Sequence, residues 1–68
     1  MSVVKIIELV GESPVNWEEA VQEAINEASK TIKKIVSADV VGFSTKIKDN
    51  KISMYRVNVK IAFIVTRE

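Results

Sequence analysis

The chain has 68 residues, ten of them basic and nine acidic, which gives a formal net charge of +1. This balance excludes the strongly basic surface that is typical of nucleic-acid-binding domains. The sequence contains no Cys and no His, so disulfide bonds and Cys/His zinc sites are excluded as well.

The length predicts a single domain, residues 1–68, that is small for independent folding. A chain of this size buries only about 60% of its unfolded surface and commonly needs a staple or a partner. With disulfides and Cys/His zinc excluded, we expect homo-oligomerisation to supply the missing burial. The N-terminus shows no signal-peptide pattern and no apolar run approaches about 18 residues. We therefore expect a cytoplasmic protein that contacts neither membranes nor nucleic acids.

Residues 2–10 are rich in β-branched side chains and are followed by Gly11, a pattern that predicts a strand ending in a turn. Both faces of this strand are largely apolar. A strand with one face in water would alternate apolar with polar residues, so we expect both faces to be covered.

Residues 16–33 are predicted to form a helix, with Asn16 as the N-cap and Glu19 completing a capping box. Apolar side chains recur with the helical period at positions 17, 20, 21, 24, 25, 28, 32 and 35. We interpret this stripe, which includes Trp17, as core. Its alanines form a narrow ridge that lets a sheet approach closely.

Two further strands are predicted, residues 36–48 and 51–66, joined at Asp49-Asn50, a pair that tolerates positive φ. The last strand alternates most clearly. One of its faces is entirely apolar and is expected to pack on the helix: Tyr55, Val57, Val59, Ile61, Phe63 and Val65. Its other face is mixed: Ile52, Met54, Arg56, Asn58, Lys60, Ala62 and Ile64.

These elements predict an α+β fold in the order β-α-β-β, with a three-stranded antiparallel sheet packed on one helix. A last strand of about 14 residues spans about 45 Å, whereas a compact domain of this length is only about 28 Å across. The terminal hairpin should therefore either extend beyond the helix or bend sharply around it, and an overhang would expose apolar side chains such as Ile52, Met54 and Ile64. Copies of the same chain are the expected cover.

Three stretches of the chain resemble the dodecin family: VVKIIELVGESPVNWEEAVQEAI, IVSADVVGFSTKI and MYRVNVKIAFIV. The most specific parts are E-L-V-G-x-S before the helix and Y-x-V-x-V-x-[IV]-A-F in the last strand. Dodecins are β-α-β-β proteins that assemble into hollow homododecamers, and many store flavins at two-fold interfaces. The resemblance covers essentially the whole chain and implies a dodecin-like homododecamer with a flavin (FMN or riboflavin) as ligand.

Two positions depart from the flavin-binding pattern. The Trp that stacks on the isoalloxazine in such dodecins corresponds to Ser37, and the Gln that binds the flavin edge corresponds to Arg56. Stacking of this kind contributes about 1–3 kcal/mol per contact, so two symmetry-related losses weaken flavin binding about a hundredfold or more. Trp17 is not expected to replace the missing ring, because its spacing places it in the core stripe. The chain most resembles the flavin-poor subfamily called calcium dodecin or secretion activator.

Ser37 and Arg56 are the candidate cofactor-binding residues. Arg56 is interpreted either as an anion clamp for a phosphate or carboxylate, or as one member of an interface ion pair with Asp39 or Glu8 of a neighbour. Ser37 either contacts the ligand or lines a void.

Two groups of charged residues suggest other ligands. Four scattered carboxylates are candidate Ca²⁺ ligands if symmetry gathers them: Glu8, Glu12, Asp39 and Asp49. Four lysines are expected around the hairpin, either as a solvated tip or as a three-fold site for coenzyme A: Lys46, Lys48, Lys51 and Lys60.

No catalytic constellation is recognisable, because no serine has a His or Cys partner and no glycine-rich phosphate motif occurs. We therefore expect a protein that is not an enzyme and that binds a small molecule at the interfaces of a homo-oligomer. The alternative is a ligand-poor structural or calcium-binding shell.

Overall fold

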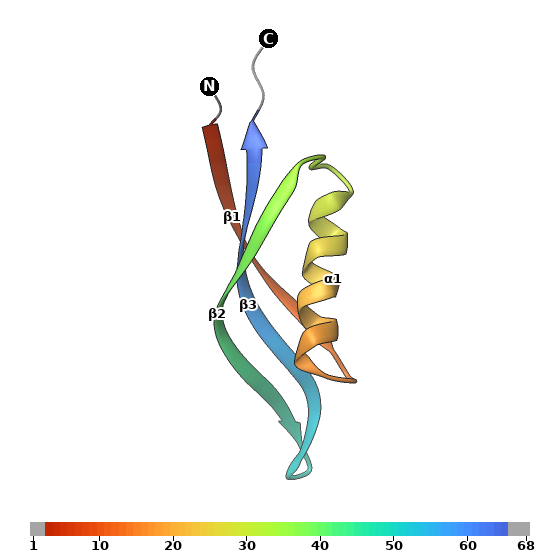
Figure 1. The fold of residues 1–68 in the computed structure, drawn as a ribbon. Helices are drawn as coiled ribbons and strands as arrows, with labels where there is room; N and C mark the ends of the chain where they lie inside the picture. Colours follow the sequence, from red (N-terminus) through yellow and green to blue (C-terminus); the bar gives the residue numbers. More distant parts are fainter. Residues whose placement is uncertain (1–2, 66–68) are drawn as a thin grey trace.

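The computed structural model describes residues 3–65 and confirms the β-α-β-β order (Figure 1). Strand β1 spans Val3–Ser13, helix α1 Trp17–Ser29, strand β2 Ile35–Lys48 and strand β3 Lys51–Val65. The sheet has the order β1-β3-β2 and both strand pairs are antiparallel. The helix covers one face of the sheet, and among the described residues no element covers the other face.

Strand β1 continues to Ser13, beyond its predicted end at residue 10. Gly11 therefore lies within the strand, and its assignment to a turn was wrong. A Cβ at Gly11 would overlap the carbonyl oxygen of Ala20 and lie 3.1 Å from the Cβ of Ala24. Glycine at this position thus lets β1 touch the backbone of α1. Ser2, which the prediction also included, lies outside the described residues.

The connection from β1 to α1 is fixed by two local hydrogen bonds. The buried Ser13 accepts a bond at Oγ from the Val15 N–H (2.9 Å). Asn16 is extended (φ −167°), and its Oδ1 accepts a bond from the Glu19 N–H (2.7 Å), which confirms Asn16 as the N-cap. Together these bonds set the direction in which the helix leaves the strand.

Helix α1 ends at Ser29, four residues before the predicted end at residue 33. The Lys30 N–H bonds the Glu27 carbonyl (3.3 Å) and the Thr31 N–H bonds the Ala28 carbonyl (3.2 Å), so the last turn tightens to the 3₁₀ pattern. Ile32 still packs against the core from this turn. The apolar period therefore continues past the helix, which is why the sequence overestimated its length.

The core is a thin layer between α1 and the central strand β3. Val57, Val59 and Ile61 are fully buried, against the ridge of Ala20, Ala24 and Ala28. Both the predicted core face of the last strand and the alanine ridge are confirmed. Tyr55, Phe63 and Val65, on the same face, are only partly buried because they lie toward the two ends of the strand.

The β2–β3 hairpin closes at the predicted pair, where Asp49 (φ 53°) and Asn50 (φ 63°) both adopt the left-handed conformation. This two-residue geometry matches the natural twist of antiparallel strands. Strand β2 begins at Ile35, one residue before its predicted start, and β3 ends at Val65 among the described residues.

The sheet is much longer than the helix that covers it. The protein measures 53 × 19 × 13 Å and its radius of gyration is 14.0 Å, against about 11 Å for a compact chain of this length. A helix of 13 residues is only about 20 Å long. The predicted overhang is confirmed. Ile52 is 51% exposed, whereas Met54 and Ile64 are partly buried.

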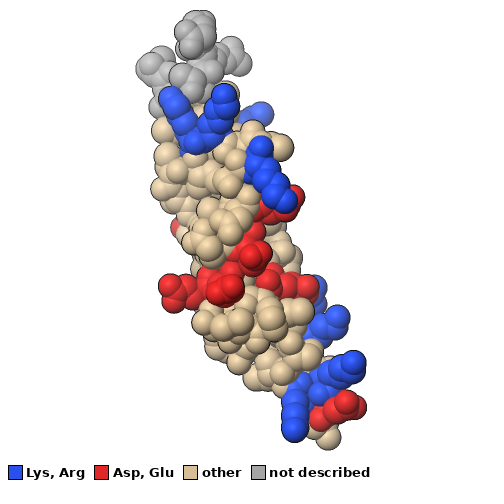
Figure 2. Space-filling model, turned by 90° about the vertical axis from the view of Figure 1, so that its right-hand side faces the viewer, with Lys and Arg blue, Asp and Glu red and all other residues tan. Residues whose placement is uncertain are grey.

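Large apolar side chains are exposed along the sheet and at both of its ends. Besides Ile52 they are Val3, Val4, Ile6, Val10, Val15, Trp17, Val36, Val40, Val41, Phe43 and Ile47. Acidic side chains gather around the middle of the helix-bearing side, and basic ones lie toward its two ends (Figure 2).

No helix in residues 3–65 has the length and apolar character that crossing a membrane requires.

We expect Gly11→Ala to lower the free energy of unfolding by about 2–3 kcal/mol, because the new methyl group forces β1 away from α1. Gly42→Ala is the matched control, since a Cβ there meets nothing within 4 Å; its stability should change by less than about 0.5 kcal/mol. Urea denaturation at equal protein concentration measures both. Equal losses in the two variants would contradict the assigned role of Gly11.

Candidate functional site

The face of the sheet that points away from α1, here called the outer face, carries both sequence-predicted ligand residues. Side chains alternate along each strand except at the register shifts of β2, and directly paired residues of antiparallel strands share a face. Four successive rows across β1, β3 and β2 are Ile6–Ala62–Ser37, Glu8–Lys60–Asp39, Val10–Asn58–Gly42 and Glu12–Arg56–Ser44. The outer face thus combines an apolar end with two rows of charged residues.

Ser37 and Arg56 are far apart within one protomer. Ser37 pairs with Ala62, and Arg56 lies six residues earlier on β3. At about 3.3 Å per residue the two rows are about 20 Å apart. One protomer therefore places both residues on the same face but does not bring them together around one small ligand.

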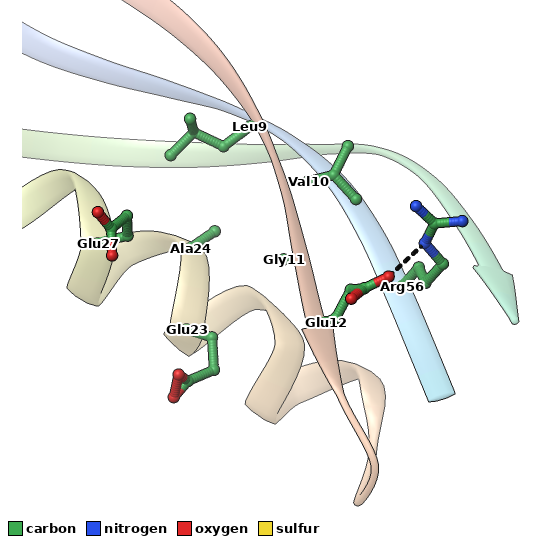
Figure 3. Close-up of a pocket in the computed structure, with 8 residues that line it drawn as sticks. All are labelled: Leu9, Val10, Gly11, Glu12, Glu23, Ala24, Glu27 and Arg56. Atoms are coloured by element: carbon green, nitrogen blue, oxygen red, sulfur yellow. Dashed lines mark ion pairs between the residues drawn. The ribbon is translucent and has the colours of Figure 1, made fainter. Parts of the chain in front are cut away.

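Arg56 forms an ion pair inside its own protomer. Its Nε lies 2.7 Å from Oε2 of Glu12, the neighbouring residue on β1 (Figure 3). The ion pair expected with Asp39 or Glu8 of a neighbouring copy is a contact between protomers and stays a prediction. Within one protomer these two acids flank Lys60 in the next charged row. Both side chains of the pair are more than 40% exposed, which leaves the guanidinium accessible to an anion.

Asn58 is a polar residue of this face that the sequence did not single out. Its Oδ1 is buried and accepts no hydrogen bond from residues 3–65. Its row neighbour Gly42 has no side chain, and a Cβ added there would meet nothing within 4 Å. Buried acceptors are almost always satisfied in native proteins. The only sequence signal for Asn58 was an amide between two valines, Val57 and Val59, in a strand.

Trp17 does not lie in the core, and this prediction was wrong. The indole is 39% exposed and packs edge-on against Phe43 and Tyr55, with ring centroids 5.7 and 5.0 Å away. Its Nε1–H donates to the Ser44 carbonyl (3.3 Å). Trp17 is the first helical residue, so it reaches past the alanine ridge onto the overhanging hairpin. It still lies on the helix side, opposite the face that carries Ser37.

The charged residues proposed as other ligand sites are dispersed. No group of three acidic side chains within residues 3–65 is arranged to hold a metal ion. Lys46, Lys48 and Lys51 lie at the hairpin end, as expected. Lys60 was expected with them, but it lies nine residues along β3 from Lys51, about 30 Å away, so that grouping was wrong.

Comparison with known proteins gives one consistent answer. The family model described as Dodecin matches residues 3–66. A protein of Mycobacterium tuberculosis named calcium dodecin is 32% identical over 63 residues, covering 93% of this chain and 89% of that protein. The similarity extends across almost the whole chain.

Solved structures agree. A dodecin from Streptomyces coelicolor superimposes with a TM-score of 0.94 at 27% identity, covering 98% of this chain and 96% of its own. A protein from Thermus thermophilus gives a TM-score of 0.94 at 28% identity over the whole of both chains. The calcium-chelating antigen of M. tuberculosis, calcium dodecin, gives 0.83 at 31% identity, covering 91% and 89%.

The Arg56–Glu12 pair should contribute about 0.5–1 kcal/mol to folding, since the contact is short but both side chains are exposed to solvent. A double-mutant cycle of Glu12→Gln and Arg56→Gln, measured by urea denaturation, gives this coupling energy. The more exposed pair Glu27–Lys30 serves as the reference and should couple by less than about 0.5 kcal/mol. A coupling of zero for Arg56–Glu12 would contradict the pairing.

Proposed function

The chain belongs to the dodecin family, and from that premise we propose that it binds and sequesters a small molecule at the interfaces of a homododecamer. The proposed activity is binding rather than catalysis. The cytoplasmic location expected from the sequence stays a prediction.

The observation that carries this proposal is the uncovered outer face. Val4, Ile6 and Val10 are 53%, 59% and 56% exposed on it. Val4 and Ile6 are successive residues of this face, and exposed apolar surface of this kind is typical of interaction sites in soluble proteins. A chain this short also gains most of its missing burial by association. The outer face of a second copy would cover these exposed apolar side chains and would also supply the missing burial.

A two-fold contact between outer faces would complete the ligand site. In a two-fold contact both copies use the same patch. When the axis passes between two rows, each row meets a different row of the partner. An axis between the Lys60 and Asn58 rows sets the Ser37 row of one copy against the Arg56 row of the other. The two residues that lie about 20 Å apart in one protomer then meet across the interface, twice per dimer.

The side chains at this composite site favour an anionic ligand over a neutral ring system. Ser37 has no aromatic face for stacking, whereas Arg56 offers a planar, permanently charged donor group. A flavin with a phosphate, such as FMN, therefore fits better than riboflavin. Coenzyme A is a further anionic candidate, with Lys46, Lys48 and Lys51 as the residues that would hold its phosphates.

Calcium binding is the second candidate function. It is favoured by the name of the M. tuberculosis relative, calcium dodecin. Because no three acidic side chains gather within the described part of one protomer, a Ca²⁺ ion with its usual six to eight oxygen ligands would need carboxylates from more than one copy.

Native mass spectrometry of the purified protein tests the proposal. We expect an assembly of twelve chains that carries an additional small-molecule mass. A ligand-free assembly whose mass increases in steps of Ca²⁺ on titration would favour the second candidate instead. A monomer at micromolar concentration would refute both.

We further expect the double variant Ser37→Trp, Arg56→Gln to bind riboflavin about a hundredfold more tightly than the unmodified chain, because it restores stacking and a neutral edge contact. Quenching of riboflavin fluorescence measures the affinity. The single variants separate the two contributions, and Ser53→Trp, at the hairpin end of β3, controls for nonspecific binding to an added indole. Unchanged affinity in the double variant would place the site elsewhere.

A further inference from the structure

A shallow groove runs along the free edge of β1, on the side of the molecule away from β2. It has a volume of about 480 Å³ and is lined by Leu9, Val10, Gly11, Glu12, Glu23, Ala24, Glu27 and Arg56. Glu23 and Glu27 come from α1, whereas Glu12 and Arg56 lie on the opposite side (Figure 3). Apolar or glycine residues form the floor. We call this feature the acidic groove.

The charge of the acidic groove is only partly neutralised within the protomer. Its three carboxylates and one guanidinium leave a net charge of −2. Glu12 pairs with Arg56, and Glu27 pairs with Lys30 through side chains that are about 70% exposed, a contact that is weak in water. Glu23 forms no ion pair with any residue from Val3 to Val65. The groove therefore attracts a basic group.

The end of the β2–β3 hairpin has the complementary character. The hairpin tip, residues 46–52, carries three lysines and one aspartate, a net charge of +2. Between the charges lie Ile47 and Ile52, which are 57% and 51% exposed. Figure 2 shows basic side chains at this end and acidic ones around the middle of the same side. The tip thus has apolar side chains surrounded by basic ones. The groove has an apolar floor bordered by acidic side chains.

The hairpin tip is held in shape before any contact. Asp49 and Asn50 form a two-residue turn with positive φ at both positions, and the Ser53 hydroxyl donates to the Lys46 carbonyl (3.1 Å) across the strands. A preorganised element loses little conformational freedom when it docks. The tip also lies beyond the end of α1, so nothing in residues 3–65 of the same protomer covers it.

We propose that the hairpin tip of one copy docks into the acidic groove of a neighbouring copy. This contact rests on the self-assembly proposed above and is distinct from the contact between outer faces. Because tip and groove are different surfaces, the contact is heterologous and must close into a ring or continue as a chain. A ring-forming contact combined with a two-fold contact produces a closed shell.

Charge reversal on each side tests this contact. The groove variant is Glu23→Lys with Glu27→Lys, and the tip variant is Lys48→Glu with Lys51→Glu. Each reversal replaces attraction by repulsion, so we expect the protein concentration at which half of the assembly dissociates to rise roughly a hundredfold. Sedimentation velocity across a dilution series measures this concentration. Raising the salt concentration to about 1 M should weaken the unmodified assembly in the same direction.

The decisive variant carries all four reversals in one chain. It restores opposite charges on tip and groove, so its dissociation concentration should return to within about threefold of the unmodified protein. Lys33→Glu with Lys34→Glu is the control, because it changes the net charge as much as the tip variant does at the other end of the molecule, and it should leave the assembly intact.

Three results would overturn the inference. Reversal variants that remain assembled would show that the groove takes another occupant, such as a basic peptide of a different protein. If the fourfold variant fails to reassemble, the reversals act on the stability of the single protomer and not on a contact between tip and groove. A monomeric unmodified protein would remove the self-assembly itself, so the two proposals fail by different observations.

Discussion

The close contact between α1 and the sheet is the constraint on which the rest of the structure depends. Gly11 lets β1 touch the helix backbone at Ala20, and the alanine ridge lies directly on Val57, Val59 and Ile61. This contact is tight but short, because a helix of 13 residues covers only the middle of a sheet in a molecule 53 Å long. The fold therefore buries one small core and leaves extensive apolar surface outside it.

The uncovered surface is organised rather than uniform. The outer face presents apolar rows, two charged rows and the orphaned acceptor of Asn58. The acidic groove and the hairpin tip form a second, charge-complementary pair of surfaces at separate places on the molecule. A protein with one small core has little interior for a buried active site. Binding between copies is the function that this distribution favours.

Two substitutions on an unchanged scaffold account for the proposed change of ligand. The backbone superimposes on dodecins at identities below one third, so architecture does not decide what is bound. In the proposed ligand site, Ser37 would offer no aromatic face and Arg56 would offer a permanent positive charge. Stacking and charge act on different parts of a ligand, so the two residues together would shift preference from neutral rings toward anions.

The sequence by itself determined the features that follow from local rules. Side-chain periodicity predicted the four elements, the N-cap at Asn16, the hairpin turn at Asp49-Asn50 and the buried face of β3, because period, capping and turn preference act over a few residues. The family resemblance located Ser37 and Arg56 along the chain. The overhang followed from strand length alone, without any knowledge of how the strands pair.

Only the tertiary structure decided which distant residues meet. The pairing of Arg56 with Glu12, the distance between Ser37 and Arg56, and the acidic groove all depend on the register of β1 and β2 against β3. The same holds for Trp17, whose periodic position predicted a core residue, whereas the helix begins at Trp17 and its indole packs on Phe43 and Tyr55 of the hairpin. Register and helix length are set by long-range packing, and a shift of one residue reverses the face of every side chain.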